Sequence, residues 1–131
     1  MLTIGIEGRI EQTVEPAQSA AAIGSGLVDV FATPMMVALM ERTCNESVMP
    51  YLDEGQTTVG TRLDITHTAA TPIGMTVRCK SELIEIDRRR LVFSVAAYDE
   101  AGVIGEGRHE RFIVDRDKFQ SKANSKLQNQ R

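Results

Sequence analysis

The clearest structural signal in this chain of 131 residues lies in residues 33–50, which read TPMMVALMERTCNESVMP. Thr33 followed by Pro34 fits an N-cap residue and then a proline in the first turn of a helix. The helical pattern runs on until Pro50 ends it. Because its first half is apolar on every side, we expect a central helix over residues 34–48 that is enclosed by the rest of the protein.

Alternating apolar and polar residues predict β-strands on both sides of this helix. A loose alternation precedes it, over residues 2–14. Four stretches that follow it alternate in the same way: 59–67, 75–83, 91–98 and 103–114. The order is therefore strand, helix and four strands in a meander. We expect an α+β fold in which an antiparallel five-stranded sheet wraps around one central helix.

The segment between the first strand and the helix has a different composition. Residues 15–26 are rich in Pro, Ala, Ser and Gly and show no apolar period. This pattern is typical of a mobile loop or a short irregular helix, and such a segment can serve as a lid. On the last strand Gly105 and Gly107 share a face, which predicts close approach of another backbone there, plausibly the central helix.

Composition limits the classes of protein to which the chain can belong. It is 42% hydrophobic and 25% charged, which fits one globular domain, and we place that domain at residues 1–118 with a solvated, partly frayed polar tail at 119–131. A net charge of -3 argues against a nucleic-acid binder, and no apolar run is long enough to span a membrane. The exposed edges of a single wrapped sheet favour self-association into a dimer.

The cysteines and histidines are few and scattered. Cys44 and Cys79 lie far apart in sequence, no secretion signal precedes them, and with two histidines they form no zinc-binding spacing. We therefore expect a cytoplasmic protein that binds no metal.

Three residues are candidates for proton transfer and substrate polarisation. Glu41 lies inside the apolar helix, where it needs a hydrogen-bonded partner or a raised pKa, unless the helix turns it to an exposed stripe. His67 ends an apolar strand face and can exchange protons near neutral pH, although, taken alone, a histidine at such a position more often has a structural role. Thr33 begins the helix, whose N-terminus attracts an anion or a polarised carbonyl oxygen.

His109 and Arg111 share a strand face, and we interpret them as part of an ordinary charged edge of the sheet.

These residues also carry a resemblance to a known family. The chain resembles the fluoroacetyl-CoA thioesterase group of the hotdog-fold thioesterases in five stretches: Val30–Glu41, Pro50–Leu52, Val59–Thr61, Thr66–Pro72 and His109–Arg111. The similarity covers most of the chain from about Val28 to Phe119.

The resemblance implies a hotdog fold and a homodimer with active sites at the subunit interface. It also implies hydrolysis of an acyl-CoA thioester without metal or organic cofactor. Thr33, Glu41 and His67 match the family's catalytic residues, and Gly60 and Arg111 match its substrate-binding residues. A lid phenylalanine that the family uses to recognise the fluorinated acyl group is replaced here by Leu27. The resemblance therefore implies a substrate-binding site that contains Gly60, Arg111 and Leu27.

The sequence therefore supports two functional hypotheses. The first is hydrolysis of a short or medium acyl-CoA to free acid and CoA, with the acyl group left open. The alternative is a non-catalytic hotdog protein that binds acyl-CoA or another small ligand, since one fold hosts several functions. The set of Thr33, Glu41 and His67 favours the enzyme, because a binder needs no acid–base residues.

Overall fold

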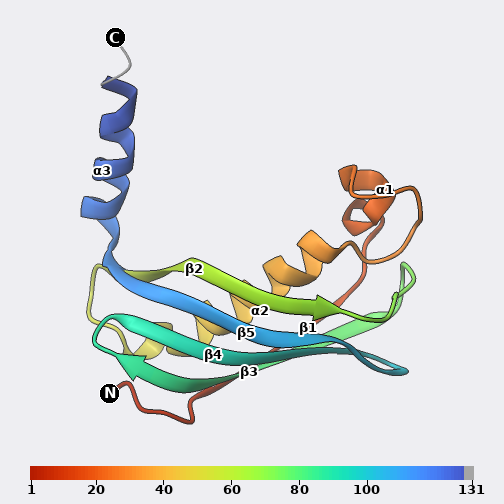
Figure 1. Cartoon of the computed structure of the whole chain (residues 1–131), viewed down its shortest axis with the longest axis horizontal. Coiled ribbons are helices and arrows are strands. Elements are labelled where there is room, and N and C mark those ends of the chain that lie inside the picture. Colours follow the sequence, from red (N-terminus) through yellow and green to blue (C-terminus); the bar gives the residue numbers. More distant parts are fainter. Residues whose placement is uncertain (129–131) are drawn as a thin grey trace.

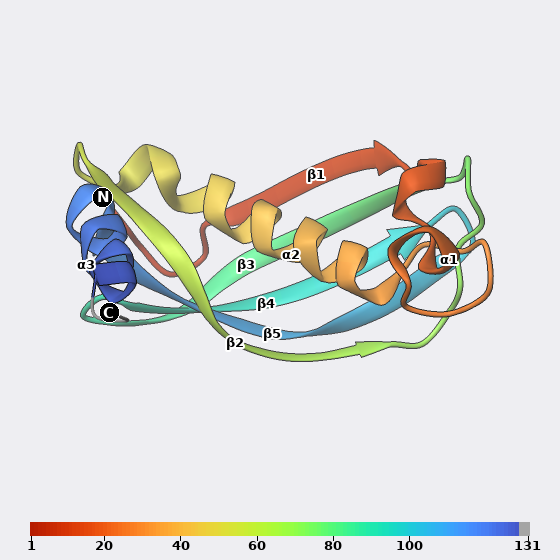
Figure 2. The ribbon, with the colours of Figure 1, turned by 90° about the horizontal axis from the view of Figure 1, so that it is seen from above.

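The computed structural model describes residues 1–128, and it places one long helix across one face of a five-stranded antiparallel sheet (Figures 1 and 2). The helix is α2 (Thr33–Val48). The strands are β1 (Glu7–Thr13), β2 (Gln56–His67), β3 (Thr76–Asp87), β4 (Arg90–Asp99) and β5 (Gly102–Asp115). The predicted fold class is confirmed.

The order of the strands in the sheet differs from the expected meander. The order is β1-β3-β4-β5-β2, so only β3, β4 and β5 follow one another as neighbours. Strand β2 pairs with β5, and β1 pairs with β3. The prediction of a four-stranded meander was therefore wrong, because α2 carries the chain from β1 at one edge to β2 at the other. Both strands that flank the helix in sequence are edge strands.

Helix α2 buries one face against the sheet rather than its whole surface. The buried side chains recur at helical spacing: Met36, Leu39, Met40, Thr43, Cys44 and Val48. All of them except Thr43 pack with Leu83, Leu91 and Phe93 of the sheet in one core cluster. Ala38 is exposed, so the expectation that the first half of the helix is enclosed on every side does not hold within a single chain.

The start of α2 also differs from the sequence prediction. The N-cap is Ala32, whose backbone is extended (φ -73°, ψ 142°), and it offers no side-chain cap. Thr33 is the first helical residue and Pro34 the second, where its missing N–H breaks no helical hydrogen bond. Thr33 is therefore not the N-cap, and its hydroxyl is free for another partner.

The segment before α2 is a short irregular helical region, as predicted. It contains the 3₁₀ turn η1 (Pro16–Gln18) and helix α1 (Ala20–Ile23). Ser19 caps α1, since its Oγ accepts a hydrogen bond of 3.0 Å from the Ala22 N–H. A second 3₁₀ turn, η2 (Met49–Tyr51), follows α2 at Pro50.

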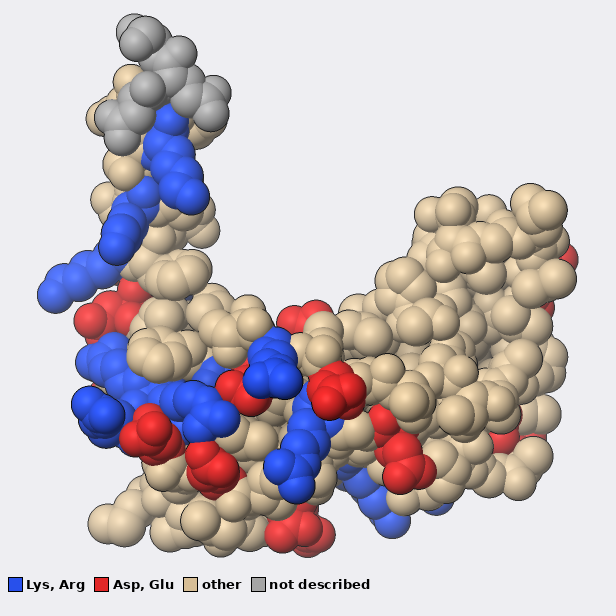
Figure 3. Space-filling model, viewed as in Figure 1, with Lys and Arg blue, Asp and Glu red and all other residues tan. Residues whose placement is uncertain are grey.

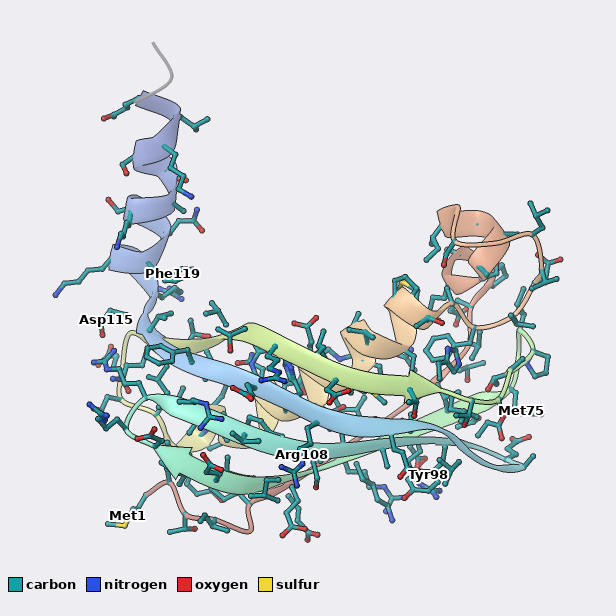
Figure 4. The ribbon with its side chains drawn as sticks, in the orientation of Figure 1. Met1, Met75, Tyr98, Arg108, Asp115 and Phe119 are labelled. Carbon is teal, nitrogen blue, oxygen red and sulfur yellow. The ribbon has the colours of Figure 1, made fainter. Side chains whose placement is uncertain are left out.

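Helix α3 (Arg116–Gln128) leaves the sheet after Asp115 and stands clear of it, with Phe119 near its base (Figure 4). None of its residues is buried. The part of the expected tail up to Gln128 is thus exposed but helical rather than frayed, and residues 129–131 lie outside the described part. No helix within residues 1–128 has the length and apolar character needed to cross a membrane.

The two glycines of β5 allow close approaches to different neighbours. A Cβ at Gly105 would lie 2.7 Å from the Met36 sulfur of α2 and 2.6 Å from the Thr66 carbonyl oxygen. A Cβ at Gly107 would instead collide with the Asp64 carbonyl of β2. The predicted close approach of another backbone occurs at both glycines, but that backbone is the edge strand β2, and the central helix reaches Gly105 only with the side chain of Met36.

Candidate active site

The first half of the candidate site joins the start of α2 to the end of β2. The Oγ1 of Thr33 lies 2.7 Å from Nδ1 of His67, across 34 residues of sequence. Two features of the fold make this contact. Thr33 is the first helical residue and not the N-cap, so its hydroxyl does not cap the helix. Strand β2 runs back along α2 and ends at His67, beside the N-terminus of the helix.

This pair lines a cleft of about 280 Å³. The other lining residues come from the segment between β1 and α2 and from the turn after β2: Ala20, Ser25, Val30, Phe31, Ala32, Thr68, Ala69 and Ala70. The cleft therefore has a mixed lining of apolar and hydroxyl-bearing side chains, in which the Thr33 hydroxyl and the His67 imidazole lie together at the N-terminus of a helix.

The electrostatic surroundings keep His67 in its neutral form at neutral pH. Burial lowers the pKa of His67 below its usual value, and a backbone contact with Ala69 offsets only part of this effect. Its Nε2 is buried and has no hydrogen-bond partner among the described residues. A neutral imidazole beside a hydroxyl is the arrangement that a general base requires.

The second half of the candidate site is a charged pair in the middle of the molecule. The Glu41 Oε2 lies 3.4 Å from Nη1 of Arg111, whose side chain is 7% exposed, while that of Glu41 is 39% exposed. The sequence left open whether Glu41 is paired in the interior or turned to solvent. The structure shows a half-buried carboxylate with an arginine partner.

Gly60 lies directly beside this pair. A Cβ at position 60 would lie 2.7 Å from Oε2 of Glu41 and 3.4 Å from Nη1 of Arg111. Glycine thus opens the space into which the carboxylate and the guanidinium extend. The structure brings together three of the residues that the sequence singled out: Glu41, Gly60 and Arg111.

The two halves are separate within one subunit. Glu41 lies eight positions after Thr33 in α2, which corresponds to about 12 Å along the helix axis. Glu41 does not line the cleft that contains His67. A single chain therefore does not bring the carboxylate and the imidazole into one pocket.

His109 has a role that the sequence analysis missed. It was assigned with Arg111 to an ordinary charged edge, but β5 is an interior strand and His109 is only 1% exposed. Its ring contacts Arg111, with Nε2 3.0 Å from Nη1. Thr58 and Asn45 complete this network, and nothing in their local sequence pattern marks them as members of it.

Leu27 lies outside the cleft in a single chain. Its side chain is 98% exposed, and Ser25, two residues earlier, is the nearest lid residue that lines the cleft. The cysteines are both free and buried. Within residues 1–128 no three His, Cys, Asp or Glu side chains gather in a way that would hold a metal ion.

Comparison with known proteins places this geometry in a family. The family described as fluoroacetyl-CoA-specific thioesterase matches residues 14–117. A fluoroacetyl-CoA thioesterase of Streptantibioticus cattleyicolor is 45% identical over 98 residues, which are 75% of this chain and 70% of that protein.

Solved structures agree with the sequence match. A structure of the fluoroacetyl-CoA thioesterase FlK superimposes with a TM-score of 0.92 at 36% identity, covering 96% of this chain and 98% of that one. A thioesterase superfamily member from Thermus thermophilus gives a TM-score of 0.90 at 29% identity, covering 98% and 96%. The chain belongs to the fluoroacetyl-CoA-specific thioesterase family, a group of hotdog-fold enzymes that hydrolyse thioesters.

Proposed function

We propose that this protein hydrolyses a short or medium acyl-CoA thioester to the free acid and CoA, with Thr33, Glu41 and His67 as catalytic residues. The observation that carries the proposal is the 2.7 Å contact between the Thr33 hydroxyl and the His67 imidazole, which both line one cleft. A thioester is already reactive, so the enzyme needs mainly a base and a site for the developing oxyanion.

The chemistry follows from the placement of these groups. Neutral His67 accepts a proton from the Thr33 hydroxyl or from a water molecule held by it, and the oxygen attacks the thioester carbonyl. The N-terminus of α2 favours the negative charge that develops on the carbonyl oxygen. The C–S bond then breaks, and the proton on His67 passes to the leaving thiolate. Where Thr33 itself is acylated, water hydrolyses the ester in a second step.

The complete site is formed by two copies of the chain. Strand β2 is an edge strand, and its residues 60–64 are all exposed in one chain. Figure 3 shows a hollow above this edge, between the lobe of α1 and the projecting helix α3. An unpaired edge of this length favours pairing with a second strand, and a homodimer joined through β2 satisfies it.

This pairing brings the two halves of the site together. If the two β2 strands run antiparallel about an axis between Leu63 and Asp64, Gly60 of one subunit lies opposite His67 of the other. Side chains of directly opposed residues have Cβ atoms about 5 Å apart on the same face of the sheet. The Thr33–His67 pair of one subunit then faces the Glu41 carboxylate of the second subunit.

The remaining assignments concern the substrate and the compartment. Gly60 and Arg111 contact the acyl group at this composite site, and Leu27 closes over it from the lid. Small side chains such as those of Ala20, Ala69 and Ala70 line the cleft and leave room for the acyl group of the substrate. A cytoplasmic location is supported by two free, buried cysteines in a chain without a disulfide between them.

The activity is tested by incubating the protein with acyl-CoA substrates of increasing chain length and following thiol release with a chromogenic disulfide reagent. The protein adds little background, because both its cysteines are buried and burial raises the pKa of Cys44 to about 12. CoA release that depends on the enzyme supports the proposal. Thermal stabilisation by acyl-CoA with no thiol release identifies a binding protein instead.

The composite site is tested by mixing two inactive variants. Glu41→Gln retains a functional His67, and His67→Ala retains a functional Glu41. After subunit exchange, half of the dimers are mixed and each has one intact site, so about a quarter of the wild-type activity returns. A mixture that stays inactive, although mass spectrometry detects mixed dimers, would contradict the proposed sharing of the site between subunits.

A further inference from the structure

The guanidinium of Arg111 is held in place by more than its contact with Glu41. Its Nε donates to the Thr58 Oγ1 at 2.7 Å, and its Nη2 donates to the Thr58 carbonyl oxygen at 2.9 Å. Thr58 in turn donates to the Asn45 Oδ1 at 2.6 Å. Nη1 is the nitrogen nearest to Glu41, and it also lies 3.0 Å from Nε2 of His109. Each of its two hydrogens therefore has one acceptor within reach.

The surroundings of His109 determine which of its nitrogens carries the hydrogen. Nδ1 lies 2.8 Å from the carbonyl oxygen of Arg62, next to the irregular register between Gly60 and Arg62. A carbonyl oxygen only accepts hydrogen bonds, so Nδ1 carries the hydrogen and donates it. The guanidinium of Arg111 only donates, so Nε2 must be the acceptor. Both contacts are satisfied together only by the neutral Nδ1–H form of the ring.

We propose that His109 is a positioning residue for the hydrolytic site. By accepting one hydrogen of Nη1, it directs the other hydrogen of Nη1 toward Glu41 and so fixes the orientation of that carboxylate. Without an acceptor at the position of Nε2, a buried N–H of a charged group loses its partner, and the guanidinium moves to recover one. This inference rests on the proposed thioester hydrolysis, because the orientation of the Glu41 carboxylate affects activity only if Glu41 takes part in that reaction.

Charges from β5 and α2 act on the His109 ring, and β2 contributes a backbone carbonyl. Arg111 and Glu110 lie on its own strand β5, Glu41 approaches from α2, and Arg62 approaches from β2, while its register partner on β4 is the apolar Phe93. Burial is the main cause that lowers the pKa of His109, and the charge of Arg111 adds to it. The Arg62 carbonyl and the two carboxylates oppose the shift without reversing it. Protonation would turn Nε2 into a donor that faces another donor.

Two substitutions separate the contact with Arg111 from the contact with Arg62. His109→Gln places an amide oxygen near the position of Nε2 and keeps an acceptor for Arg111. His109→Asn places an amide N–H near the position of Nδ1 and keeps only the donor to Arg62. Both variants retain a polar, hydrogen-bonded side chain at this buried position, so they form a matched pair.

We expect the glutamine variant to keep kcat within about threefold of the wild-type value and the asparagine variant to lose about tenfold or more, the scale of one lost hydrogen bond to a charged group. KM should stay near the wild-type value in the glutamine variant, and it should rise in the asparagine variant, because the displaced guanidinium of Arg111 also contacts the acyl group. An asparagine variant with wild-type kcat would overturn the inference. So would equal losses of kcat in both variants together with equal losses of Tm, which would indicate packing alone.

A nitrogen NMR spectrum of the imidazole in the ligand-free protein provides a readout that does not depend on activity. The expected ring has a protonated Nδ1 and an unprotonated Nε2 at neutral pH, and a protonated Nε2 would refute the inference. The failure of the proposed function looks different: a wild-type protein that releases no CoA from any substrate tested, while its ring retains the expected tautomer.

Discussion

Glu41 fills the space that a side chain at position 60 would need, since a Cβ on Gly60 would lie 2.7 Å from the Oε2 of Glu41. The same Cβ would lie 3.1 Å from Cε1 of His109. Strand β2 thus lacks a side chain at the position where Glu41, His109 and Arg111 meet. This relationship explains why a glycine, which weakens a strand, occurs in the middle of β2.

Gly60→Ala is therefore expected to lower activity more than stability. The backbone of Gly60 is not in the left-handed region, so alanine fits the strand, but the Glu41 carboxylate must move away from Arg111. A displacement of this size is expected to lower kcat/KM by about 10- to 100-fold. Steady-state kinetics and circular dichroism check both parts, with Thr61→Ala as the neighbouring control. Wild-type kinetics in Gly60→Ala would contradict the assigned role of Glu41.

Thr33→Val tests whether the threonine hydroxyl acts in chemistry or in capping. The substitution keeps the shape of the side chain and removes the contact with His67. We expect kcat to fall by about 100-fold or more, the scale of a lost acid–base partner, while Tm stays unchanged because Ala32 is the N-cap. Thr33→Ser, which keeps a hydroxyl, should retain most of the activity. A loss of stability of about 1 kcal/mol with little loss of kcat would instead indicate a cap.

The sequence predicted the elements of the fold better than their neighbours in space. Periodicity is local, so it located α2 and all five strands within a few residues. Strand partners are set by the path of the chain across the sheet. The apolar periodicity of a strand does not indicate its partner, so it could not predict that β2 pairs with β5 rather than with β3. The assignment of His109 to a charged edge failed for the same reason, since burial depends on which strands flank β5.

The candidate site shows a similar division. Thr33 was recognised as the start of the helix, but its hydroxyl contacts a residue 34 positions away, and only the folded chain shows that contact. Thr58 and Asn45 lie in ordinary strand and helix sequence, and they enter the site through Arg111. Residue types alone also do not reveal that, within one chain, Glu41 lies outside the cleft that contains Thr33 and His67.

Gly105→Ala tests the close approach between β5 and the central helix. A Cβ there would meet the side chain of Met36 at 2.7 Å and the Thr66 carbonyl at 2.6 Å. Met36 can move, but the backbone of β2 cannot do so without disturbing its pairing with β5. We expect a loss of stability of about 1–3 kcal/mol, as for an overpacked core. Denaturant unfolding measures it, and Glu106→Ala, an exposed neighbour on the same strand, should change stability by less than about 0.5 kcal/mol. Equal stability of the Gly105→Ala variant and the wild type would mean that β2 yields easily at this point.

Acidification should destabilise the protein before its carboxylates titrate. Burial lowers the pKa of both His67 and His109 in the folded chain, whereas the unfolded chain binds protons on histidine with a pKa of about 6.5. Below about pH 6.5 the unfolded state therefore holds more protons than the folded state, and stability falls as the pH drops toward the folded pKa values. The loss stops below those values.

The pH window identifies the groups responsible for this loss. Arg90 lowers the pKa of Glu110 below its usual value of 4.5, so the stability that this carboxylate contributes is lost only in more acidic solution. Denaturant unfolding between about pH 7.5 and about pH 5 should thus report mainly on the histidines. His109→Gln, which cannot titrate, should lose less stability across this window than the wild type. Equal losses in both proteins would mean that His109 binds a proton as easily in the folded chain as in the unfolded one.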